Sequence, residues 1–200
     1  MNHEPAPTTP EAAASPEREA TEAKSPAIYV ASLADYVNGK LHGTWIDATI
    51  GAGAIHQKIQ AMLAASKEPA PEEWAIHDYK DFDPLRLSEF SDIDRVAAIA
   101  EHIKKYGPAF ASWLDFTDFG PADWHYFTEA YLGEYEDIEA YVEHVIDDLD
   151  YETVLDERLP ESLRGYVRIS KAAMARDLQA NGSIFTVRAG NSIHVFNARI

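Results

Sequence analysis

The sequence predicts an α+β protein of three small units in a row, α+β, helical and α+β, behind a disordered N-terminal tail. Three observations predict it: strand patterns near both ends of the folded chain, helical periodicity in the middle, and a Pro-, Ala- and Glu-rich start. We expect the units at residues 27–90, 91–125 and 126–200, after a tail at 1–26. The tail has no large apolar residue after Met1, so it cannot bury enough surface to offset its ordering entropy.

The first unit is expected to contain two strands, Ala27–Tyr36 and Gly43–Thr49, joined by a tight hairpin turn. Asn38-Gly39 supplies the positive-φ pair that such a turn requires. A third strand is expected at Glu73–Tyr79. Between the second and third strands, apolar residues at helical spacing predict a helix with one buried face: Ile55, Ile59, Met62 and Leu63.

The middle unit is expected to be helical throughout. Ser91 and Asp94 form a capping-box pattern at the start of the first helix, and Gly107-Pro108 ends it. A second helical stretch is expected over residues 108–118, and a third over residues 121–132.

The last unit is expected to begin with a long amphipathic helix over Gly133–Asp150. Ser170 is the expected N-cap of a further helix, which Asn181-Gly182 ends. The final segments SIFTVR and SIHVFNA alternate around Gly190-Asn191 and predict a closing hairpin.

Acidic residues are concentrated in one part of the chain. The net charge is −17, yet residues 68–161 hold 26 acids against 6 bases, whereas residues 162–200 sum to +5. Between Tyr106 and Glu157 there are 15 Asp or Glu residues and no Lys or Arg. Such a field repels nucleic acid and anionic membranes and attracts basic surfaces and cations. We therefore expect neither nucleic acid nor membrane as a partner.

Five carboxylates fall on one side of the helix expected at Gly133–Asp150. At about 100° per residue they lie within an arc of roughly 80°, opposite the apolar stripe, and cover about 21 Å of axis. Like-charge pairs four residues apart cost ~0.2–0.5 kcal/mol each, so stability alone would not select this face. A surface that meets a cationic partner explains it. The five are Glu136, Glu139, Glu143, Asp147 and Asp150.

The sequence shows no pattern of an enzyme. There is no cysteine, the eight histidines have no metal-ligand spacing, and no pair of acids is marked out for acid–base catalysis. We expect no cofactor and no metal. The alternative is a calcium-binding or cation-buffering acidic protein; a hydrolase that uses an unrecognised carboxylate pair is a further rival. No apolar run approaches the roughly 20 residues of a membrane span, so we expect a soluble cytoplasmic protein.

Three segments resemble the ArdA antirestriction family. FTEAYLGEYEDIEAYVEHV resembles the antirestriction motif of this family, and YVASLADYVNGKLHGTWIDA and LPESLRGYVRI resemble two other recurrent segments. The resemblance implies an elongated three-domain homodimer that is not an enzyme. It also implies that surface acids imitate bent B-DNA and fill the DNA-binding channel in the methyltransferase core of type I restriction-modification enzymes. Members are typically carried on mobile genetic elements.

The resemblance and the charge pattern together predict the site. Packing and the dimer contact are expected at motif residues Tyr131, Gly133, Tyr135 and Tyr141. The expected DNA-mimic carboxylates are the fifteen acids between Tyr106 and Glu157, which we call the acidic span: Asp115, Asp118, Asp123, Glu129, Glu134, Glu136, Asp137, Glu139, Glu143, Asp147, Asp148, Asp150, Glu152, Asp156 and Glu157.

Overall fold

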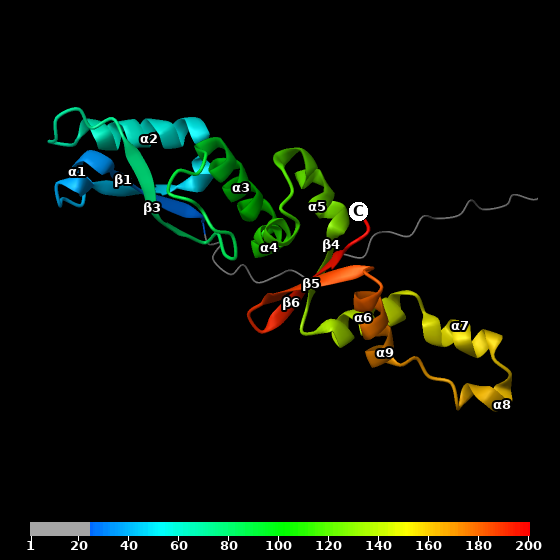
Figure 1. Cartoon of the computed structure of the whole chain (residues 1–200). Coiled ribbons are helices and arrows are strands. Elements are labelled where there is room, and N and C mark those ends of the chain that lie inside the picture. Colours follow the sequence, from blue (N-terminus) through cyan, green and yellow to red (C-terminus); the bar gives the residue numbers. More distant parts are fainter. Residues whose placement is uncertain (1–24) are drawn as a thin grey trace, which may run out of the picture.

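A computed structural model describes residues 25–200 as an elongated molecule of helices and two small sheets (Figure 1). The predicted α+β class is confirmed. Residues 1–24 of the expected tail lie outside the described residues. Ser25 and Pro26, which the sequence assigns to the same tail, are hydrogen-bonded to Asp47 and Ala48.

The first sheet is antiparallel, with strand order β2-β1-β3. It consists of β1 (Ala27–Ser32), β2 (Gly43–Asp47) and β3 (Trp74–Lys80). After β2 the chain turns through η1 (Ala48–Ile50) into α2 (Ala52–Ala64), which packs on the sheet. The four apolar residues predicted for one helix face, Ile55, Ile59, Met62 and Leu63, are buried.

Two predictions for this unit are wrong. The strand expected to reach Tyr36 ends at Ser32, and the chain continues as α1 (Leu33–Val37) because the Ser32 hydroxyl caps it by accepting from the backbone N–H of Asp35. The tight hairpin is absent because Asn38 ends α1 at a φ of −87°, and only Gly39 has a positive φ. β1 and β2 nevertheless pair as neighbours.

The middle of the chain is helical, as predicted. It contains α3 (Ile93–Tyr106), α4 (Pro108–Thr117), η2 (Pro121–Tyr126) and α5 (Phe127–Ala130). Gly107, with φ of 76°, separates α3 from α4 at the predicted stop.

Two details of this helical region differ from the prediction. The N-cap of α3 is Asp92, whose carboxylate accepts from the backbone N–H of Arg95, whereas the Ser91 hydroxyl accepts from Ser88 outside the helix. The third helix is interrupted as well: a 3-10 turn precedes one turn of α-helix, and the chain leaves as a strand at Tyr131 because that residue pairs with Phe196.

The second sheet has the order β4-β6-β5. Its strands are β4 (Tyr131–Tyr135), β5 (Ile184–Ala189) and β6 (Ser192–Asn197), all antiparallel. Ala189 pairs with Ser192 across the Gly190-Asn191 turn, so the predicted closing hairpin is confirmed.

The long helix predicted over Gly133–Asp150 is shorter than expected. Residues up to Tyr135 belong to β4, because they pair with β6 and because Gly133 has a φ of 130°, which no α-helix accommodates. The helix α6 begins at Ile138, after Asp137 as N-cap, and ends at Asp148. Asp150 then adopts the left-handed conformation, with φ of 48°, and breaks the helical path.

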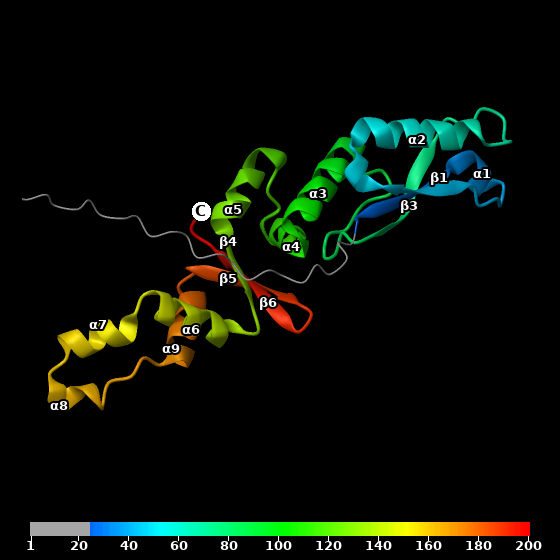
Figure 2. The ribbon, with the colours of Figure 1, turned by 180° about the vertical axis from the view of Figure 1, so that it is seen from behind.

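The C-terminal helices form a separate layer beyond the second sheet. α6 packs on α9 (Lys171–Ala180), which Ser170 caps as predicted. Between them α7 (Tyr151–Arg158) and α8 (Glu161–Arg164) form an arm at the end of the molecule, clear of both sheets in the front and rear views (Figure 1, Figure 2). Neither α7 nor α8 contains a buried residue, so the arm is held mainly through its connections to α6 and α9.

Two hydrophobic clusters hold these layers together. The larger runs from Ile28 to Ala130 and also takes in Phe196 of β6, so the first sheet, the middle helices and one face of the second sheet share a core. The smaller centres on Val142, Ile146 and Ala175, between α6 and α9. The elements that carry the acidic span thus begin at the larger cluster, with α4, and continue to the smaller one, with α6.

Candidate acidic interaction surface

The acids of the acidic span lie on the outside of six consecutive elements and their junctions. Every one of them except Asp123, which is half-buried, is exposed to solvent. In chain order the elements are α4 and its C-terminus (Asp115, Asp118), η2 (Asp123), α5 (Glu129), β4 (Glu134), the entry to α6 and α6 itself (Glu136, Asp137, Glu139, Glu143, Asp147, Asp148), and the break and α7 (Asp150, Glu152, Asp156, Glu157).

The line of carboxylates on α6 contains three members instead of the five predicted. Glu139, Glu143 and Asp147 lie four residues apart on the exposed side of the helix, while Val142 and Ile146 are buried on the other. They span about 12 Å of axis, at ~1.5 Å per residue. Glu136 precedes the helix and Asp150 follows it, so neither continues the line by helical geometry.

Several acids of the span also have a local structural task. Asp137 accepts from the backbone N–H of Ala140 at 2.8 Å and so starts α6. Asp118, with φ of 52°, and Asp150 occupy left-handed positions at helix junctions, which Asp adopts more readily than most residues. Glu134 accepts from the Ser192 hydroxyl of the neighbouring strand. These contacts fix the backbone beneath the acidic surface.

A basic residue from outside the span lies on the α6 line. Lys171, the first residue of α9, forms an ion pair with Glu143, and both side chains remain accessible at 41% and 57%. Its hydrogen bond to Glu143, together with the charges of Glu143, Asp147 and Glu139, raises the pKa of the Lys171 ammonium. No pattern local to the span could have revealed this residue, because 28 positions separate it from Glu143.

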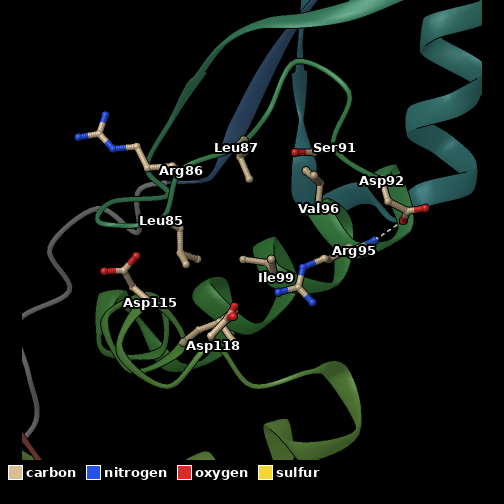
Figure 3. A pocket seen from close by; sticks show the side chains of 11 residues that line it. Leu85, Arg86, Leu87, Ser91, Asp92, Arg95, Val96, Ile99, Asp115 and Asp118 are labelled. Carbon is tan, nitrogen blue, oxygen red and sulfur yellow. Dashed lines mark hydrogen bonds between the residues drawn. The ribbon is translucent and has the colours of Figure 1, made fainter.

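Acidic and basic side chains also lie close together near α4. A hollow of about 330 Å³ lies between α3, α4 and the loop that follows β3, and its lining includes Arg86, Arg95, Asp115 and Asp118. Figure 3 shows Arg95 and Asp118 directed toward one another, whereas Arg86 points away. The Arg95 guanidinium also lies 5.8 Å from the centre of the Trp124 ring, a cation–π distance.

The four motif residues organise the packing of β4 on both sides. Tyr131 stacks on Phe127, with ring centres 5.5 Å apart, and its hydroxyl lies 3.3 Å from Nδ1 of His194. Tyr135 meets Tyr141 edge to face at 5.2 Å. A Cβ on Gly133 would lie 3.0 Å from the Tyr135 ring, so a side chain there would crowd that ring. Tyr131 thus joins the large core, and Tyr135 joins the α6 layer.

The chemistry that this surface offers is negative charge exposed to solvent. Within residues 25–200, no three His, Asp or Glu side chains are grouped so that they could hold a metal ion. Over the same residues, no helix is long and apolar enough to cross a membrane. Among residues 25–200, two ion pairs involve acids of the acidic span. One joins Glu143 to Lys171, and the other joins Asp148 to His144 at 3.2 Å.

Fold and surface together define an acidic α+β protein, whose small sheets and helices carry a row of exposed carboxylates. The family model described as "Antirestriction protein (ArdA)" matches residues 28–192, and the chain belongs to this family. It is an antirestriction protein, from a family of inhibitors of restriction-modification enzymes and not a known enzyme family. Among curated proteins, no sequence matches the chain.

Proposed function

We propose that this antirestriction protein acts as a stoichiometric mimic of B-DNA. It binds the DNA-binding channel in the methyltransferase core of type I restriction-modification enzymes and excludes the duplex. The carboxylates of the acidic span take the places of the DNA phosphates. The protein binds these enzymes in the cytoplasm. Carriage on a mobile genetic element, whose DNA meets the restriction enzymes of a new host, fits this role.

The observation that carries the proposal is the exposure of the acidic span. Fourteen carboxylates face solvent within 52 consecutive residues that contain no Lys or Arg. On α6 they occur about every 6 Å, against about 3.4 Å per phosphate along one B-DNA strand. Binding of the target's Lys and Arg side chains to these carboxylates would replace the phosphate contacts that normally drive DNA binding.

The surface offers charge but no base edges. Hydrogen bonds to base edges give a DNA-binding protein its sequence preference, whereas phosphate contacts position the duplex without reading it. The inhibitor is therefore blind to the target's recognition sequence. It acts on enzymes of one architecture that recognise different sequences.

The proposal includes a homodimer of three-unit protomers, with boundaries near residues 90 and 125. The motif residues Tyr131, Gly133, Tyr135 and Tyr141 support the dimer contact by fixing β4 and α6, which carry the surrounding surface. Light scattering on the purified protein tests this part: a mass of twice 22.3 kDa is expected, and a single-chain mass at micromolar concentration would contradict it.

Competition binding tests the function itself. A labelled duplex carrying the recognition site is bound to a type I methyltransferase core, and the protein is titrated in. Displacement that is complete near one inhibitor per DNA-binding channel supports mimicry. A duplex that stays bound while methylation by the core is still inhibited would place the contact outside the channel.

A further inference from the structure

The ion pair between Lys171 and Glu143 places one cation in the middle of the carboxylate line of α6. Glu139 and Asp147, the neighbours of Glu143 along that line, also contribute to the electrostatic field at the Lys171 ammonium. The position is set by packing, because Ala175, one turn after Lys171, is buried against Val142 and Ile146. The lysine is therefore held over the acidic line by the core beneath it.

The local chemistry of α9 does not favour a lysine at this position. Lys171 directly follows the N-cap Ser170, and the N-terminus of a helix carries partial positive charge that favours acids. The favourable partner of this ammonium lies across the interface, on α6. An exposed ion pair of this kind adds little to folding stability. Its larger effect is on the charge that α6 presents.

We propose that Lys171 is an internal counter-cation that limits the affinity of the acidic surface for its target. This inference rests on the proposed function. Basic side chains of the enzyme must compete with Lys171 for Glu143, so the middle carboxylate of the line is partly neutralised before any contact is made. The inhibitor therefore binds the enzyme less tightly than its number of acidic residues implies. Fewer counterions are also released when the complex forms.

Lys171→Met tests this, because methionine keeps the length and apolar stem of the side chain while removing its charge. The Kd for a type I methyltransferase core is expected to fall roughly threefold to fivefold at low salt, the size of one exposed ion pair. The slope of log Kd against log salt should steepen by about one, as for one additional neutralised charge. Lys171→Arg should behave as the parent does.

The chain supplies a matched control. Lys40 also pairs with a glutamate 28 positions away, Glu68, but this pair lies outside the acidic span, and the Glu68 side chain is only 11% exposed against 57% for Glu143. Lys40→Met removes the same charge and should leave Kd and its salt slope unchanged. If both Lys→Met variants tightened binding equally, a general change in net charge would explain the effect and the inference would be lost.

A double-mutant cycle separates this inference from the function on which it rests. Glu143→Gln should weaken binding more in the Lys171→Met background than in the parent, because only there is the carboxylate free. An additive cycle, or a Lys171→Met variant that binds no tighter than the parent while remaining folded by circular dichroism, overturns the role of Lys171. Failure of the parent protein to displace duplex DNA in the competition experiment would instead overturn the mimicry itself.

Discussion

Acidic residues behave differently in the N-terminal unit and in the acidic span. In the N-terminal unit two acids are tied to the fold. Asp35 is buried and accepts from the Ser66 hydroxyl at 2.6 Å, and the largely buried Glu68 accepts from the side chains of Asn38 and Lys40. In the acidic span nearly all carboxylates face solvent, and Lys171 and His144 are the basic side chains paired with them in the described chain.

The difference separates two uses of the same functional group. A buried carboxylate with a donor contributes to folding, because losing it leaves the donor unsatisfied. An exposed row of like charges lowers folding stability somewhat, and it contributes favourable free energy only when a cationic partner binds. Changes to the first kind should therefore affect stability, and changes to the second kind should affect binding.

The sharpest way to break this comparison is to neutralise the α6 line. Glu139→Gln, Glu143→Gln and Asp147→Asn together should weaken binding to the methyltransferase core at least tenfold, on the order of one exposed ion pair per carboxylate. The salt slope should flatten by about two to three. Titration at several salt concentrations measures both.

The matched control for this triple variant carries the same charge change elsewhere. Glu72, Glu73 and Glu89 are exposed acids before the acidic span, and their change to Gln should alter binding much less. Equal weakening by both triple variants would mean that total charge, and not the α6 surface, governs the interaction.

Asp35→Asn should lower Tm by several degrees, whereas Glu143→Gln should leave Tm nearly unchanged or slightly raised. The Ser66 hydrogen bond holds the pKa of the Asp35 carboxyl below its usual value. Its stabilisation is therefore complete above the unfolded pKa and is lost as the pH falls through the lowered folded pKa. Thermal melts across pH should show a parent that loses Tm below about pH 4 more steeply than the variant does.

Salt should stabilise the whole protein by a smaller amount. Between about 10 mM and 200 mM NaCl the Debye length falls from roughly 30 Å to under 10 Å, so repulsion within the −20 of residues 68–161 is screened and Tm should rise by a few degrees. Calcium chloride at equal ionic strength should act similarly. A rise specific to calcium would favour the cation-binding alternative.

Deleting residues 1–24 should have the smallest effect. The deletion leaves Ser25 and Pro26, whose hydrogen bonds to Asp47 and Ala48 tie the start of the described chain to the first sheet. Melting and competition are expected to match the parent. A truncated protein that folds but no longer displaces DNA would assign a functional segment to this region.

Local patterns predicted much of the fold. The stop at Gly107-Pro108, the cap at Ser170 and the hairpin at Gly190-Asn191 were all predictable, because each depends on the φ preference or capping group of one or two residues. The prediction failed where a distant segment decides the structure. The predicted helix included Gly133–Tyr135. In the structure these residues form part of β4, because they pair with β6, some 60 residues away along the chain.

The same division applies to the surface. The sequence by itself determined that the middle of this protein is acidic and free of Lys and Arg, because composition and chain position need no folding to be read. It also determined which acids lie opposite the apolar stripe within α6, because helical periodicity is local.

Only the tertiary structure decided which basic side chains lie beside these acids. Packing of α9 on α6 brings Lys171 to Glu143, and packing of α3 on α4 brings Arg95 towards Asp118. Electrostatic interactions depend on distance through space and not along the chain, so the charge that a partner meets is set by the fold.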